Sequence, residues 1–187
     1  MTIFILLLVA VVAAVVWLIG LYNNLVELRN NRENAFQNID VQLKLRHDVI
    51  PNLVETVKGY ATHERETLQQ VIEARNIAVN ARTIDDKVKA ESTLGNLLGA
   101  LRVTIERYPE LKANENFMEL QKELSDIEHK LAAVRRFFNS ATREYNNAVE
   151  RFPGCLIASR FGFTKETMFD VGEEERKQLD KAPVVKF

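Results

Sequence analysis

The stretch IFILLLVAVVAAVVWLI, residues 3–19, is an unbroken run of apolar side chains, and the first charged residue of the chain is Glu27. With Gly20 and Leu21 the run extends to about 19 residues, or roughly 28 Å as an α-helix, which approaches the thickness of a bilayer's hydrocarbon core. A helix that is apolar on every face has no polar side to turn toward water. We therefore expect residues 1–21 to form a transmembrane anchor, with the lipid bilayer as its partner.

A cleaved signal peptide is the alternative interpretation of this run. No Lys or Arg precedes it, it is longer than a usual signal-peptide core, and no small-x-small cleavage site ends it. Trp17 and Tyr22 suit the aromatic belt at a membrane interface. These features favour an anchor that is retained.

The basic residues near the run predict its orientation. None precedes it, whereas Arg29 and Arg32 follow it closely. The positive-inside rule then places the N-terminus outside and the remainder of the chain in the cytoplasm, although Glu27 and Glu33 weaken the bias. The single Cys155 fits either side, because one thiol cannot form an internal disulfide.

The composition of the chain beyond the run favours one helical domain. The formal net charge is −1, from 25 basic and 26 acidic residues that are finely interspersed. This balance provides no basic surface for nucleic acid and no strong attraction to an anionic lipid surface. Seven Gly and four Pro in the whole chain leave few turns, which favours long helices.

A few residues mark where those helices begin and end. Pro51 predicts a kink or local irregularity inside the first of them. Thr83 and Asn114 can cap the third and fourth helices, and Pro153-Gly154 stops the fourth. The predicted helices cover about 22–60, 63–82, 83–109 and 114–152.

Apolar residues in the fourth predicted helix recur at alternating steps of three and four, which is a heptad pattern sustained over five heptads. The first helix carries a poorer version of the same pattern. Two long and two short helices with a shared period predict an all-α chain in which the anchor is followed by an antiparallel four-helix bundle over residues 22–154. The pattern in the fourth helix comprises Phe117, Leu120, Leu124, Ile127, Leu131, Val134, Phe138, Ala141, Tyr145, Ala148 and Phe152.

Polar residues crowd the first helix, which must also supply the core. One interpretation is that most of them face solvent, while the arginines in the heptad register extend their charge to water or pair with acids on a neighbouring helix. The other is a partly buried polar network that fixes the helix register or forms a binding surface. The candidate interaction residues are Arg29, Arg32, Asn34, Asp40, Gln42, Arg46, His47 and Asn52, together with His63 beyond the helix.

Motifs for catalysis or metal binding are not found. HERET at 63–67 lacks the second histidine of a zinc-protease helix, and His47 and His129 have no ligand spacing. Cys155 has no local histidine to activate it. The sequence therefore predicts no catalytic residue, no metal, no cofactor and no enzymatic activity, and elemental analysis would exclude the remaining class, a metal-dependent hydrolase.

Three stretches of the chain closely resemble the LemA family of bacterial membrane proteins. They are YNNLVELRNNRENAFQNIDVQLKLRHDVIPNLVETVKGYATHE (22–64), YPELKANENFMELQKEL (108–124) and REYNNAVERFPGCLIASRFGF (143–163). Phe137-Phe138 departs from the family, which tends to have tyrosines there. Matching positions include Asn34, Asp40, Gln42, Arg46, His47, Pro51, Asn52, His63, Asn116, Phe117, Gln121, Asn139, Asn146 and Phe152-Pro153.

The resemblance implies an N-terminal helix in the bacterial inner membrane and a helical bundle on its cytoplasmic side. It brings no assigned reaction. By analogy with magnetosome membrane proteins, and through the association of the family with a membrane-bound zinc metalloprotease, it implies membrane organisation or an adaptor role.

The C-terminal segment divides into two parts. Residues 155–171 are too apolar for an unpacked tail, so we expect them to pack on the bundle or on a partner. Residues 172–187 are expected to be a mobile tail.

These observations lead to two hypotheses about function. The first is a single-pass scaffold or adaptor that forms a homo-oligomer and has no catalytic activity of its own. The alternative is an accessory or regulatory subunit of a membrane-bound metalloprotease in envelope quality control, which would be small alone and would co-purify with the protease.

Overall fold

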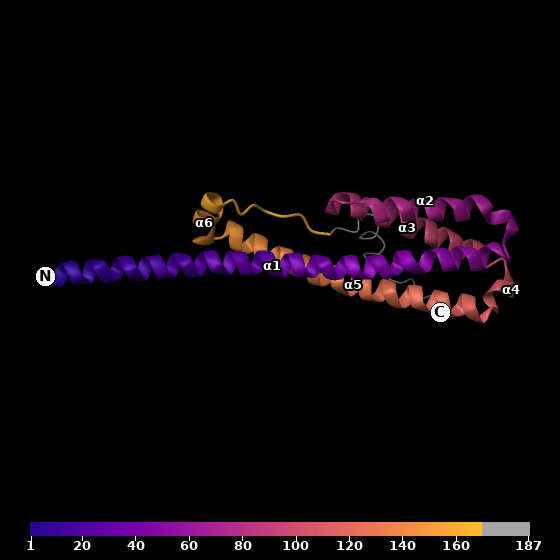
Figure 1. Cartoon of the computed structure of the whole chain (residues 1–187), viewed down its shortest axis with the longest axis horizontal. Coiled ribbons are helices and arrows are strands. Elements are labelled where there is room, and N and C mark those ends of the chain that lie inside the picture. The colour runs from indigo at the N-terminus through magenta and orange to yellow at the C-terminus, as the bar shows by residue number, and fades with distance from the viewer. Residues whose placement is uncertain (170–187) are drawn as a thin grey trace, which may run out of the picture. The chain divides into compact units, whose positions relative to one another are not determined.

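The computed structural model describes residues 1–169, and every regular element among them is helical (Figure 1). The prediction of an all-α chain is confirmed. The tail predicted for residues 172–187 lies outside the described residues, as do residues 170–171. The elements are α1 (Thr2–Lys58), the short 3-10 helix η1 (Thr62–Glu64), α2 (Arg65–Asn80), α3 (Ile84–Ile105), α4 (Pro109–Lys112), α5 (Glu115–Glu150) and α6 (Gly154–Phe161).

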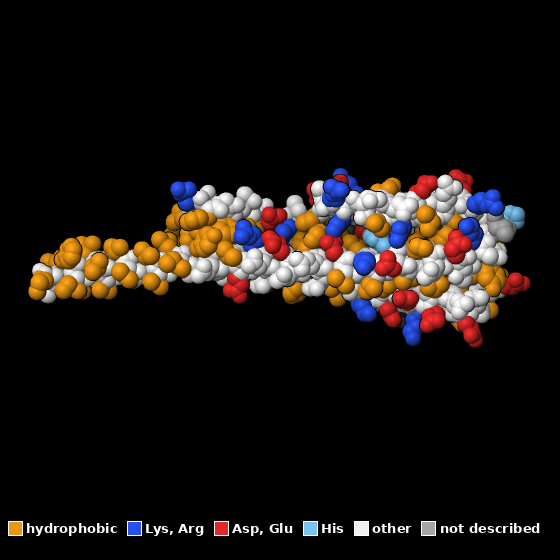
Figure 2. Space-filling model, in the orientation of Figure 1, with side chains coloured by type: hydrophobic (Ala, Val, Ile, Leu, Met, Phe, Trp, Pro, Cys, Tyr) orange, Lys and Arg blue, Asp and Glu red, His pale blue; other side chains and the backbone are white. Residues whose placement is uncertain are grey.

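The apolar run and the first polar helix form one helix, α1, of 57 residues. Every large apolar side chain from Ile3 to Ile19 is exposed, the least exposed being Leu18 at 46% (Figure 2). Within residues 1–169, α1 is the one helix long and apolar enough to cross a membrane. Its N-terminal part is thus compatible with a membrane anchor.

The described residues divide into two compact units. The first, unit 1, comprises Met1–Ile39 and Val134–Met168. The second, unit 2, comprises Asp40–Ala133 and, of the last residues, Phe169. The long helices α1 and α5 each contribute one part to each unit.

The core of unit 1 lies where α1, α5 and α6 meet. Leu25 of α1 is 1% exposed and packs with Tyr145 of α5 and with Ile157 of α6. Phe163, just after α6, completes this core. Gly162 ends α6 in the left-handed conformation, which a residue without a Cβ adopts at little cost.

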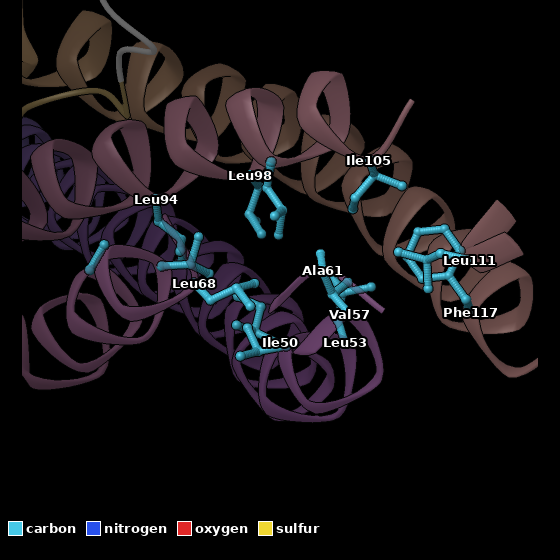
Figure 3. Packing of buried hydrophobic residues seen from close by; sticks show 14 of the residues in the cluster. Ile50, Leu53, Val57, Ala61, Leu68, Leu94, Leu98, Ile105, Leu111 and Phe117 are labelled. Atoms are coloured by element: carbon cyan, nitrogen blue, oxygen red, sulfur yellow. The ribbon is translucent and has the colours of Figure 1, made fainter. Parts of the chain in front are cut away.

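The core of unit 2 is larger and draws on five helices (Figure 3). α2 and α3 pack against each other and are joined by a short loop in which Thr83 caps α3 by accepting from the Asp86 amide. The cluster is built from the following buried residues: Ile50, Leu53, Val54 and Val57 of α1; Ala61; Leu68, Val71, Ala74 and Ala78 of α2; Ala90, Leu94, Leu98, Leu101 and Ile105 of α3; Leu111 of α4; and Phe117 of α5.

Most residues of the heptad pattern in α5 are buried or half-buried. Phe152 is the exception, because α5 ends at Glu150 and this side chain is 77% exposed, so its predicted place in the core was wrong. The short helices α4 and α6 were not foreseen as separate elements. The Asn114 side chain caps α5 as predicted, by accepting from the Phe117 amide at 2.9 Å.

Candidate functional site

A buried carboxylate on α3 binds two polar residues of α1 in unit 2. Glu91 is 3% exposed, and its Oε2 accepts from Arg46 Nη1 at 2.8 Å. Its Oε1 lies 2.6 Å from Nε2 of His47. Each carboxylate oxygen therefore has a partner on α1, so Glu91 holds α1 against α3.

Arg46 makes a second, weaker ion pair with Glu128 of α5, at 3.4 Å. Glu128 is largely exposed, so most of the compensation for burying the guanidinium comes from Glu91. The Nε of Arg46 is buried and has no hydrogen-bond partner among the described residues. The cluster Arg46, His47 and Glu91, here called the Glu91 cluster, thus places charged groups inside a helical core.

A cleft of about 300 Å³ opens beside His47. Asp40 and Lys87 form an ion pair at it, with Asp40 contributed by α1 and Lys87 by α3. Its lining carries charges of both signs and has no single-sign field that would select an anion or a cation. The other polar residues that line it are Lys44, His47, Asp48 and Arg75.

A second polar cluster lies in unit 1, around Arg32. This guanidinium forms an ion pair with Glu166 at 3.1 Å, donates to the Thr167 carbonyl and lies over the Phe138 ring. Asn146 of α5 makes two 2.9 Å bonds to the backbone of Glu166, one to its carbonyl and one from its amide. The segment after α6 is thereby fixed to α1 and α5.

Arg29 and Tyr145 extend this second cluster. The guanidinium of Arg29 lies 5.1 Å from the centre of the Phe163 ring. Burial raises the pKa of the Tyr145 hydroxyl above its ordinary value, and the nearby Glu166 carboxylate adds to this rise, while Arg29 and Arg32 oppose it. Tyr145 therefore stays neutral beside the ion pair.

The remaining sequence-predicted residues do not join either cluster. Asn34 and Asn52 are exposed on α1, and His63 is exposed in η1. Gln42 is half-buried, and its Oε1 is buried without a hydrogen-bond partner among the described residues. Of the nine candidates, Arg46 and His47 belong to the Glu91 cluster, Arg29 and Arg32 belong to the cluster in unit 1, and the other five lie outside both.

The HERET segment has a structural role. The Glu64 carboxylate accepts from Arg107 at 3.1 Å and from the Tyr108 hydroxyl at 3.2 Å. Partial burial raises the pKa of Tyr108, and its hydrogen bond to Glu64 raises it further. Within residues 1–169, no group of three or more His, Cys, Asp or Glu side chains is arranged to hold a metal ion.

Sequence reasoning missed Glu91, the central residue of the Glu91 cluster. A signal was present, because Val88, Glu91, Leu94 and Leu98 follow the three- and four-residue steps of an apolar pattern. An acid at such a position predicts a buried partner of opposite charge. Glu166 carried no such signal, because it lies outside any periodic segment.

Comparison with known proteins places this arrangement in a family. The model of the LemA family matches residues 35–187, which is most of the chain. The chain belongs to the LemA family. The matched region contains the whole Glu91 cluster, and it also contains Asn146 and Glu166 of the second cluster.

Similar curated proteins cover most of this LemA-family chain. Protein LemA of Metamycoplasma hominis is 27% identical over 165 residues, covering 87% of this chain and 74% of the relative. Magnetosome protein MamQ of Magnetospirillum gryphiswaldense is 23% identical, covering 86% of this chain and 68% of the relative. Magnetosome protein MamQ 2 of Paramagnetospirillum magneticum is 21% identical, covering 94% and 72%.

Proposed function

We propose that this LemA-family chain is a membrane-anchored helical scaffold or adaptor, which assembles with copies of itself and organises membrane partners without catalysing a reaction. The observation that carries the proposal is the exposed apolar surface of residues 3–19, in a helix that continues into the core of unit 1 at Leu25. Such a surface needs lipid or protein to cover it. A chain attached to lipid in this way is suited to holding other proteins at the membrane.

The polar clusters support a structural role. In the Glu91 cluster, both carboxylate oxygens are used to hold α1, and in unit 1 the Glu166 carboxylate is paired with Arg32. Buried charges that are paired in this way are best attested as devices that fix one register between helices. A scaffold requires such a defined shape.

Self-association is supported by two small residues of the anchor. Ala10 and Ala14 lie one turn apart on α1. Small residues at this spacing allow two helices to approach closely within a bilayer. Leucine at both positions would separate the helices.

The test is the mass of the full-length protein in mild detergent, measured by light scattering. The wild type is compared with A10L/A14L and with a truncated chain that begins at Leu21. A discrete homo-oligomer that becomes smaller in both altered chains supports the proposal. The matched control is V12L/V16L, which has the same spacing about 200° away around the helix and should leave the mass unchanged.

A monomer in every chain would refute the scaffold. If such a monomer co-purified with a membrane-bound metalloprotease, an accessory role would replace it. Equal loss of mass in V12L/V16L would show that the anchor associates without using its small residues, and would refute that part of the proposal.

The orientation forms part of the proposal, with the N-terminus outside and the two units in the cytoplasm of a bacterial cell. Arg29 and Arg32 close to the end of the anchor support it. The test is S140C in a C155S background, since Ser140 is exposed on α5. A membrane-impermeant maleimide should label this cysteine only after cell lysis, and labelling of intact spheroplasts would contradict the orientation.

A further inference from the structure

Large apolar side chains are exposed in and just before α6. Phe152 is 77% exposed, Leu156 63% and Phe161 62%. The buried side of this short helix is formed by Gly154, Ile157 and Ala158, which already pack on α1 and α5. The three exposed residues therefore do not contribute to the core of unit 1. An exposed apolar cluster of this kind marks a contact with lipid or protein.

The position of α6 along α1 indicates whether lipid or protein covers these exposed residues. The rings of Phe161 and Phe163 approach Tyr22 edge-on, with centroids 5.0 and 5.7 Å away. Tyr22 directly follows the apolar run, and Leu21 packs against the same core as Ile157. Figure 1 shows α6 beside α1 where the bare N-terminal part of that helix begins, and apolar atoms gather there in Figure 2.

The length of the apolar run fixes the depth of this point. Residues 3–21 span roughly 28 Å as a helix, close to the hydrocarbon thickness of a bilayer. Tyr22 then lies at the membrane interface, where amphipathic aromatic rings are enriched. Phe161, in contact with Tyr22, must lie at the same level.

The charges around α6 suit the same location. Arg151 and Arg160 are exposed, and the sequence GCLIASRF contains no acidic residue. Each basic residue near an anionic membrane surface gains a favourable interaction from the surface potential. Apolar side chains flanked by arginines are typical of helices that lie within the interface.

We propose that α6 is a second membrane contact, lying in the interfacial layer of the bilayer that holds the anchor, with Leu156 and Phe161 among the lipid tails. The contact rests on insertion of residues 3–19, the part of the proposed function that concerns the anchor. It is independent of self-association. The bound class is phospholipid, with anionic headgroups facing the arginines.

The test uses depth-dependent fluorescence quenching in the full-length protein. Trp17 is the single tryptophan of the chain, so W17F provides a silent background. F161W and L156W are each added to it, and the proteins are reconstituted into vesicles of phosphatidylethanolamine and phosphatidylglycerol. Part of the lipid is then replaced by phosphatidylcholine brominated near the carbonyl end of its acyl chains.

F137W in the same background is the matched control. Phe137 is 59% exposed, much like Phe161, and its neighbour Phe138 packs against Phe36, which is roughly 21 Å beyond Tyr22 along α1. The brominated lipid should quench F161W and L156W several-fold more strongly than F137W. Quenching of Trp17 in the unaltered protein reports anchor insertion separately, so failure of the anchor is distinguished from failure of the α6 contact.

Three results would overturn the proposal while Trp17 is quenched. Equal quenching of F161W, L156W and F137W would show that α6 does not contact the membrane. Blue-shifted emission without quenching would show that protein, such as a second copy of the chain, covers this surface. Quenching of F161W alone would show that Leu156 lies outside the lipid, so α6 would not lie in the interfacial layer as proposed.

Discussion

Arg75 replaces the backbone donor that Pro51 lacks, because its Nε lies 3.1 Å from the His47 carbonyl oxygen. In a regular helix this oxygen would accept from the amide of residue 51, which proline does not have. The carbonyl that Pro51 leaves without its helical donor is thus satisfied from α2. The proline and the arginine together specify which helix packs at this level of unit 2.

Arg75→Ala should lower the free energy of unfolding by about 1–3 kcal/mol, because the His47 carbonyl is left without a partner. The same change in a Pro51→Ala background should cost less, because alanine at that position restores the helical amide donor. Urea denaturation of the four proteins in detergent gives the coupling between the two positions. Gln70→Ala, at an exposed position of α2, is the control, and additive effects at 51 and 75 would contradict the exchange of donors.

Glu91→Gln should destabilise unit 2 by about 3–5 kcal/mol, because it leaves the Arg46 guanidinium buried with only the weaker, solvent-exposed ion pair to Glu128 as compensation. The paired change Arg46→Met with Glu91→Leu should recover most of that loss, since it removes both charges. Chemical denaturation measures both. Glu123→Gln, at an exposed position of α5, should change little, and an equally small effect at Glu91 would show that the cluster is dispensable.

Asn146→Ala should release the segment after α6, because the side chain binds both the amide and the carbonyl of Glu166. The expected cost is about 1–3 kcal/mol, because two partly buried hydrogen bonds are left unmade. Hydrogen exchange followed by mass spectrometry should show faster exchange at residues 164–168. Asn147→Ala at the next, half-buried position is the control, and unchanged exchange in Asn146→Ala would contradict the role of this side chain.

Gly154→Ala should destabilise unit 1, because a Cβ at this position would collide with the Ala148 carbonyl oxygen, a backbone atom that cannot rotate away. Gly99→Ala is its counterpart, since nothing lies within 4 Å of a Cβ there and Gly99 is inside α3. That change should stabilise the protein by about 1 kcal/mol through helix propensity. Thermal unfolding should therefore move in opposite directions in the two variants, and a shift of the same sign in both would be inconsistent with the packing at Gly154.

The periodic and local features of this chain could be predicted from its sequence. The apolar run, the helix caps at Thr83 and Asn114 and the buried pattern of α5 depend on spacing within one helix. Phe152 departed from its pattern because α5 ends two residues before it, and helix ends are set by local competition that spacing alone does not resolve.

The contacts between distant segments could not be predicted in the same way. Arg46 and His47 were identified as candidates, but Glu91 is more than forty residues away on another helix. Which acid meets which base depends on the register between helices, and this register results from the packing of the whole core. Asn146 and Glu166 illustrate the same limit, because one partner offers only its backbone, which every residue possesses.

The absence of a break in α1 between residues 2 and 58 has a mechanical consequence. Only one turn separates Leu21, at the end of the apolar run, from Leu25 in the core of unit 1, so no flexible linker stands between the two. A transmembrane helix tilts when the surrounding bilayer becomes thinner. In this chain such a tilt would apply a torque directly to Leu25 and its neighbours. A change in membrane thickness would therefore place a mechanical load on the core of unit 1.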